Sequence, residues 1–228
     1  MNIDEIFPKK EGECLDSFVQ EKYEKEHCKM NPAKDVILNG SKYSLNLDEY
    51  KILKKVAKKS KIRMSEIEDY EPKRAFTKYL GVEIENSRIT KIHLNNCGLK
   101  SMKFLKHFKN LNSINLSNNE ISKIDGLDGL KELKSLYLMN NNICEIAGLK
   151  NSHSLEELNL QSNKISKINE LSCLMNLKIL ILSYNPLPSL DGLNGLKNLS
   201  ALCLQGIKTV YENELLEKLC NEGTVVTL

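Results

Sequence analysis

Several features that define whole classes of proteins are missing from this sequence. It contains no run of about 18 apolar residues, the length that a membrane-spanning helix needs. Met1 is followed by Asn2, Asp4 and Glu5, whereas a signal peptide begins with basic and then apolar residues. We therefore expect an intracellular protein without a membrane span, located in the cytoplasm or the nucleus.

An excess of charge of one sign and closely paired cysteines are also missing. The 33 basic and 30 acidic side chains leave a formal net charge of +3, which argues against a broad surface for polyanions. The seven cysteines are odd in number and form no CxxC pair, which favours reduced thiols over a disulfide framework or a zinc site. With only five prolines and 41% hydrophobic residues, the chain is expected to fold.

Leucine, in contrast, is abundant and unevenly distributed. Thirty of the 36 leucines follow residue 88, where a 22-residue block repeats along the sequence. The five full blocks start at Ile89, Leu111, Leu133, Leu155 and Leu177, and an incomplete sixth starts at Leu199. Block positions 1, 4, 6, 11, 14, 17 and 20 are apolar in 34 of 35 cases, with Ser152 as the exception. This regularity predicts stacked repeats, none of which could fold alone.

Each block contains a short predicted strand and a sharp turn. Alternation at positions 3 to 7 predicts a strand whose leucines point inward. At position 9, after the strand, an amide side chain can bond backbone groups that the turn leaves unpaired. Stacked copies would form a ladder, which ends where the sixth block has Ile207. The predicted ladder residues are Cys97, Asn119, Asn141, Asn163 and Asn185.

The sequences at both ends of the repeats are suited to capping. Residues 81–85 predict a strand beside the first repeat strand. After the repeats, Leu215, Leu216 and Leu219 predict a helix, which Gly223 ends before a last strand over 224–228. The C-terminal cap is therefore assigned to residues 211–228 and the repeats to residues 81–210.

Residues 1–80 have a different composition and predict an α-rich subdomain or an extended N-terminal cap. Amphipathic helices are expected over 12–30 and 47–60, with another after Pro72, and a hairpin over 36–45. Seven basic residues lie between Lys51 and Arg63, a density that would suit phosphate contacts. The favoured interpretation is a solvated helix face, because four acidic residues follow between Glu66 and Glu71.

Side chains at block positions 3, 5 and 7 point away from the leucine core onto the sheet. Few of them are charged, and Tyr137, Met139, Ile179 and Ile181 place apolar groups on nearby strands. Such a cluster usually marks a protein contact. The alternative is that the N-terminal segment or a long side chain folds over it. The predicted partner-binding residues are Lys91, His93, Asn95, Ser113, Asn115, Ser135, Tyr137, Met139, Glu157, Asn159, Gln161, Ile179, Ile181, Ser183, Tyr184 and Cys203.

The chemistry of an enzyme is not evident in the sequence. None of the motifs GxSxG, GxGxxG, GxxxxGKS/T, HExxH or an EF-hand loop occurs. His93, His107 and His153 fall at different block positions, so we do not expect them to form one cluster. The prediction is a protein without catalytic activity, cofactor or metal.

The unit LNSINLSNNEISKIDGLDGLKE, from Leu111, resembles the 22-residue class of leucine-rich repeats. That class occurs in the nuclear regulatory subunit of protein phosphatase 1, the leucine-rich protein of the U2 particle and an axonemal dynein light chain. The resemblance implies an α/β fold, a curved solenoid with a parallel sheet on its concave face, here preceded by the α-rich segment.

The function that the resemblance implies is a non-catalytic scaffold that binds a protein through the concave sheet. A phosphatase regulatory subunit, with the phosphatase catalytic subunit as partner, is the favoured form, and a monomer is expected. The alternatives are a ribonucleoprotein assembly subunit or a nucleic-acid adaptor that uses the basic segment from Lys51 to Arg63.

Overall fold

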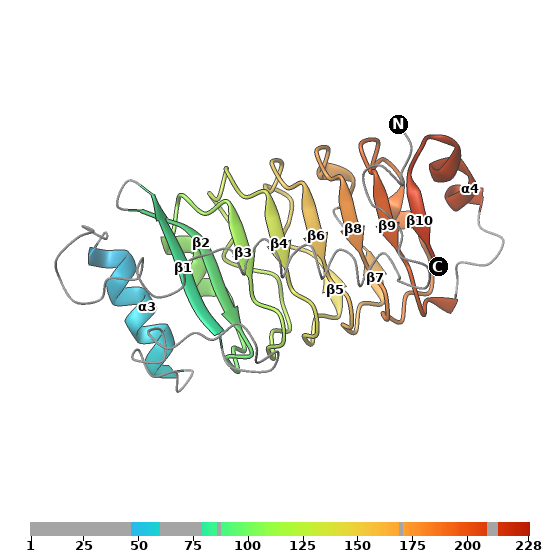
Figure 1. Cartoon of the computed structure of the whole chain (residues 1–228). Helices are drawn as coiled ribbons and strands as arrows, with labels where there is room; N and C mark the ends of the chain where they lie inside the picture. The colour runs from blue at the N-terminus through green and yellow to red at the C-terminus, as the bar shows by residue number, and fades with distance from the viewer. Residues whose placement is uncertain (1–46, 60–78, 86–87, 169–170, 209–213) are drawn as a thin grey trace, which may run out of the picture.

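The computed structural model of the chain describes residues 47–59, 79–85, 88–168, 171–208 and 214–228. Its main element is an eight-stranded sheet, which Figure 1 shows as a row of strands along the molecule. In spatial order the strands are β1 (Tyr79–Glu85), β2 (Arg88–Asn95), β3 (Ser113–Asn115), β4 (Ser135–Tyr137), β6 (Glu157–Asn159), β8 (Ile179–Ile181), β9 (Ala201–Cys203) and β10 (Val225–Thr227). The predicted α/β class is confirmed.

The strands from β2 to β9 pair in parallel with the register that the sequence period dictates. Ser113 pairs with Ser135, and Ser135 pairs with Glu157, each partner lying at the same position of the following block. The same one-block offset joins β2 to β3, β6 to β8 and β8 to β9. Every block therefore contributes one strand at the same place in its turn.

The elements that the structure describes in the return segments are short. They are the 3-10 helices η2 (Lys103–His107), η3 (Leu171–Cys173) and η4 (Asp191–Leu193) and the two-residue strands β5 (Glu145–Ile146) and β7 (Lys167–Ile168). Strands β5 and β7 pair in parallel, again with an offset of one block. These elements turn the chain back toward the next strand of the main sheet.

The core lies between the sheet and the return segments. Leu136, Leu158 and Leu180 occupy the same position on neighbouring strands, and each is at most 1% exposed. Phe108 fills the first block, where its ring meets that of Phe104 edge to face. Because each layer of apolar side chains is covered by the next, the core runs continuously from one end of the stack to the other.

Buried amides at block position 9 tie consecutive turns together. The amide nitrogen of Asn141 donates to the carbonyl oxygens of Leu116 in the preceding turn and Leu138 in its own turn, at 3.0 Å each. Its Oδ1 accepts from the backbone N–H of Ile121 at 3.0 Å. The other three ladder asparagines make the same set of contacts. Cys97, in the first block, donates its backbone N–H to Asn119 Oδ1 instead.

Helix α3 (Leu47–Lys59) and strand β1 cover the first repeat. Strand β1 pairs antiparallel with β2, as expected for residues 81–85. Leu53, Val56 and Ala57 are buried on one face of α3, in the core of the molecule. Glu49, only 1% exposed, accepts the backbone N–H of Ile89 at 2.9 Å and lies 3.5 Å from Arg88. The first turn is thereby connected to a helix that is not part of the repeats.

Helix α4 (Glu214–Asn221) and strand β10 cover the other end. Leu216 and Leu219 are buried, and Gly223 follows the helix with φ +93°, a conformation that favours glycine. Strand β10 pairs in parallel with β9, and Thr224 donates its hydroxyl to the Leu199 carbonyl oxygen at 2.8 Å. The predicted helix, glycine and strand are all present. The predicted helices over 12–30 and after Pro72 and the hairpin over 36–45 lie outside the described residues.

Candidate interaction surface

The side chains at block positions 3, 5 and 7 project from the face of the sheet opposite the leucine core. We call these side chains, together with Tyr184 beside Gln205, the sheet surface. The structure divides the predicted partner-binding residues by their exposure. Tyr184 is exposed, and a half-buried group consists of Lys91, Asn95, Ser135, Tyr137, Met139, Glu157, Gln161 and Ile179. The buried group consists of His93, Ser113, Asn115, Asn159, Ile181, Ser183 and Cys203.

The burial of Ile181 corrects the prediction of an exposed apolar cluster. Ile181 is 1% exposed, and Tyr137, which was expected to be exposed, is half-buried. Ile181 lies in register between Asn159 and Cys203, so it has a close side-chain neighbour on each adjoining strand. Of the four predicted apolar residues, Met139 and Ile179 are half-buried, and the hydroxyl of Tyr137 donates to Glu157.

Some buried polar residues of the sheet surface bond their own backbone. Asn115 Oδ1 accepts the N–H of Ser117, and Asn159 Oδ1 accepts the N–H of Gln161, both at 3.0 Å. Ser183 Oγ accepts the N–H of Gln205 in the next turn at 3.2 Å. These side chains hold the strand ends in place, and their acceptor atoms are already used.

A hollow of about 490 Å³ lies over the first half of the sheet surface, between β1 and β6. It brings together Lys91, Ser113, Ser135, Tyr137 and Glu157 of the predicted residues. The Tyr137 hydroxyl donates to the Glu157 carboxylate, and Lys91 forms an ion pair of 2.8 Å with Glu83. The floor of the hollow is therefore polar and carries charges of both signs.

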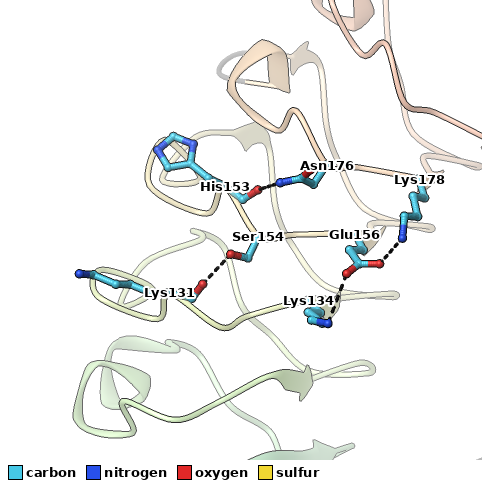
Figure 2. A network of polar contacts seen from close by, with 7 residues as sticks. All are labelled: Lys131, Lys134, His153, Ser154, Glu156, Asn176 and Lys178. Atoms are coloured by element: carbon cyan, nitrogen blue, oxygen red, sulfur yellow. Dashed lines mark hydrogen bonds and ion pairs between the residues drawn. The ribbon is translucent and has the colours of Figure 1, made fainter.

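Charged residues occupy block position 2 just before β4, β6 and β8, and the first of them, Lys134, lines the hollow. Figure 2 shows Glu156 between Lys134 and Lys178, with ion pairs of 3.5 and 2.5 Å. The hydrogen bond from Lys178, together with the charges of both lysines, lowers the pKa of the Glu156 carboxyl. Sequence reasoning missed this row, although the Lys, Glu, Lys pattern at residues 134, 156 and 178 was a readable signal.

The same part of the molecule has hydrogen bonds between the return segments of consecutive turns. Ser154 Oγ donates to the Lys131 carbonyl oxygen at 2.6 Å, and Asn176 donates to that of His153 at 2.8 Å (Figure 2). These bonds lie next to the Lys134–Glu156–Lys178 row, and they connect the return segments that lead into β4, β6 and β8. The border of the sheet surface is thus held by contacts between turns.

Tyr184 has an unusual conformation for an exposed aromatic residue. It follows β8 at block position 8, where its side chain is 54% exposed and its φ is +58°. Asn96, Asn118 and Asn140 occupy this left-handed position in the first three blocks. A Cβ atom at Gly206, the equivalent residue of the next turn, would lie 2.7 Å from the Tyr184 ring. The ring is therefore accommodated by a glycine in the neighbouring turn.

Among the described residues, no group of three or more His, Cys, Asp or Glu side chains could hold a metal ion. None of the helices in these ranges has the length and apolar composition of a membrane span.

Comparisons with known proteins relate the chain to repeat proteins. Residues 100–187 match the leucine-rich repeat family, whereas no curated protein matches the chain. The chain is similar to an internalin from Listeria monocytogenes, with 28% identity and a TM-score of 0.50, over 57% of this chain but only 38% of the internalin. The chain is also similar to the leucine-rich repeat ectodomain of the receptor kinase SOBIR1 from Arabidopsis thaliana, with 18% identity and a TM-score of 0.50. This match covers 73% of this chain and 96% of the ectodomain, and the likeness concerns the fold alone.

Proposed function

We propose that this leucine-rich repeat protein is a non-catalytic scaffold that binds a protein partner through the sheet surface between β4 and β9. Leucine-rich repeat modules are typically interaction modules rather than enzymes. The observation that carries the proposal is Tyr184, because it keeps an exposed ring at a position where a bulky residue costs backbone energy. Backbone strain kept at an exposed aromatic residue points to a function for that residue.

The surroundings of Tyr184 suit a contact with a protein. Gln205 lies beside it, with its Oε1 3.4 Å from the Tyr184 hydroxyl. Ile179 begins β8, the strand that Tyr184 follows, and Met139 follows β4, two strands away in the sheet. The half-buried apolar residues would supply contact area, and the polar hollow toward β1 would supply hydrogen bonds at the rim.

The more specific role that we propose is a regulatory subunit, and a protein phosphatase catalytic subunit is the first partner to test. The support for it is the resemblance of the 22-residue unit to that of phosphatase regulators. An assembly subunit of a ribonucleoprotein is the second form of the same scaffold function. In both forms the protein acts as a monomer in the cytoplasm or nucleus.

The test compares Tyr184→Asn with the wild type in affinity purification from the native cell. Asparagine occupies the equivalent position in three blocks, so the variant should fold while losing the ring. Met175→Ser is the matched control, because Met175 is 48% exposed but lies in a return segment. We expect Tyr184→Asn to lose a partner that Met175→Ser retains. If both variants retain the same partners, the sheet surface is not the binding site.

A further inference from the structure

The exposed face of helix α3 is basic. Leu53, Val56 and Ala57 bury one face of the helix, whereas Lys51, Lys55 and Lys58 are exposed on the other. With a rise of 1.5 Å per residue, the spacing i, i+4, i+7 extends the three ammonium groups over about 10 Å of helix axis. The helix lies at the end of the molecule beside β1 (Figure 1).

The 3-10 helix η2 extends this basic face with residues from a distant part of the sequence. Helix α3 packs against η2, which follows it in the chain only after β1 and β2 and exposes Lys103, Lys106 and His107. An open hollow of about 680 Å³ is lined by these three residues together with Lys109, Asp125, Gly126 and Asp128. We call Lys51, Lys55, Lys58, Lys103, Lys106, His107 and Lys109 the basic surface.

The ion pairs of the basic surface are few and weak among the described residues. Asp48 pairs with Lys51 at 3.8 Å, and Asp125 pairs with Lys103 at 3.9 Å, both long and exposed contacts. Within the described part of the chain, no carboxylate lies within ion-pair distance of Lys55, Lys58 or Lys106. The small net charge of the whole protein therefore conceals a local excess of positive charge.

We propose that the basic surface binds the phosphate backbone of a nucleic-acid duplex without reading its sequence. Lysines supply charge to phosphates but no fork of donors for base edges. Phe104, the aromatic residue of η2, packs against the core and is not a platform for stacked bases. A duplex backbone can be bound through charge alone, without contacts to base edges.

Other polyanionic partners fit this surface less well. Insertion into an anionic membrane requires a free apolar helix face, but that face of α3 is buried against the repeats. An acidic protein would need anchor residues, such as exposed aromatic or aliphatic side chains, and the exposed residues of the basic surface are lysines and one histidine. The inference is independent of the sheet surface, because α3 and η2 do not contribute to it.

The experiment measures binding of the full chain to a fluorescent RNA duplex of about 20 base pairs by anisotropy, between 50 and 200 mM KCl. Neutralisation of about four phosphates predicts a slope near −3.6 in log K against log salt, and hence about 100-fold weaker binding at the higher salt. A DNA duplex should bind similarly. Anionic lipid vesicles serve as the competing polyanion, and we expect weaker binding to them.

Charge reversal at the basic surface should abolish the interaction. Lys55→Glu/Lys58→Glu/Lys106→Glu is expected to bind the duplex at least tenfold more weakly, with its fold intact by circular dichroism. The control Lys150→Glu/Lys164→Glu/Lys197→Glu changes the net charge equally at three exposed lysines elsewhere on the repeats and should bind within about threefold of the wild type. Tyr184→Asn should bind like the wild type.

Three results would overturn the proposal. The wild type could show no salt-sensitive binding to the duplex, the two triple variants could weaken binding equally, or the vesicles could bind more tightly than the duplex. The first would mean that other groups cancel the local charge, the second that only net charge matters, and the third that the ligand is a lipid surface. Affinity purification of Tyr184→Asn tests the protein-binding proposal, and anisotropy tests the duplex-binding proposal. Either proposal can therefore fail without the other.

Discussion

Block position 8 shows how a single backbone conformation selects residue types along the stack. Its φ lies between +53° and +70° in Asn96, Asn118, Asn140, Ser162, Tyr184 and Gly206. Asparagine and glycine tolerate this left-handed region, whereas a bulky side chain raises the energy of the folded state. Tyr184 is therefore the residue of this series that stability alone would not select.

The first prediction follows from that difference. Tyr184→Asn should raise the free energy of unfolding, by up to about 1 kcal/mol, because asparagine relieves part of the strain. Urea denaturation monitored by circular dichroism measures it, with Met175→Ser as a control expected to change little. A loss of more than about 1 kcal/mol would show that the ring has a packing role instead.

At block position 9, a buried amide stabilises two turns at once. Asn141→Ala would leave the Ile121 N–H and the Leu116 and Leu138 carbonyl groups without these bonds. Since a buried unsatisfied group costs about 1–3 kcal/mol, we expect a loss of about 2–4 kcal/mol in the free energy of unfolding. The control is Asn151→Ala, an exposed side chain with one 3.3 Å contact to Asp128, which should lose less than about 0.5 kcal/mol. Equal losses in the two variants would contradict the structural role of the ladder.

Residue roles that recur with the period could be predicted from the sequence, whereas a role that depends on particular residues of neighbouring blocks could not. The asparagine at position 9 bonds its own turn and the preceding one, and its recurrence from block to block indicated that role. The burial of Ile181 depends on Asn159 and Cys203 in the adjoining strands, and alternation alone placed it on the surface. The left-handed backbone at Tyr184 could have been predicted from the sequence, because asparagines occupy the equivalent residues 96, 118 and 140.

At the scale of elements, helix α3 is joined to the repeats by a buried carboxylate as well as by apolar packing. Glu49→Ala should lower the free energy of unfolding by about 2 kcal/mol, because it leaves the Ile89 N–H without this acceptor and removes the ion pair with Arg88. It should also speed trypsin cleavage after Lys51, Lys55 and Lys58, since α3 would detach more often.

The adjacent residue provides the control for this prediction. Asp48→Ala removes an exposed carboxylate from the first turn of α3, 3.8 Å from Lys51, and it should lower the free energy of unfolding by less than about 1 kcal/mol and speed cleavage less than Glu49→Ala does. If Glu49→Ala is cleaved at the same rate as Asp48→Ala, then apolar packing alone holds α3.

The row Lys134–Glu156–Lys178 joins the beginnings of three neighbouring strands. Because the folded pKa of Glu156 is lowered from its ordinary value of 4.5, its carboxylate stabilises the protein above that pH, and the contribution is lost as pH falls through the folded pKa. Glu156→Gln should therefore be less stable than the wild type at pH 7, by less than about 1 kcal/mol, and equally stable at strongly acid pH. Thermal denaturation from pH 7 to 3 tests it.

Two controls, the salt concentration and a second variant, distinguish the ion pairs of Glu156 from a general effect of net charge on stability. The difference between Glu156→Gln and the wild type should shrink in about 1 M salt. Glu145→Gln removes an exposed carboxylate for which no ion pair is present among the described residues, and it should show no such difference. If Glu156→Gln is less stable than the wild type by the same amount at acid pH as at pH 7, the ion-pair explanation is contradicted.

The repeating elements were predictable because one period sets all of them. The one-block offset in every parallel pairing between repeats is the period of the leucines, and the strand over residues 81–85 followed from its β-branched and apolar residues next to the first block. The contact between α3 and η2 was not predictable, because it joins two segments that the period does not relate. The basic surface could therefore not be recognised from the lysines of residues 51–63 alone.

On the scale of the whole molecule, the row of strands separates the two proposed binding surfaces. Helix α3 lies beside β1, and Tyr184 follows β8, five strands further along the sheet. At about 4.8 Å per strand, this separation is about 24 Å. The chain could therefore hold a protein at the sheet surface and a duplex at the basic surface at the same time.

The claim that a partner binds the sheet surface, and not the return segments, is tested most directly by site-specific photo-crosslinking in the native cell. A photoreactive phenylalanine analogue would replace Tyr184 in one variant and Met175 in another, both exposed positions on different sides of the repeats. We predict one discrete cross-linked protein from position 184 and none from position 175. The same product from both positions, or a product from position 175 alone, would contradict the account.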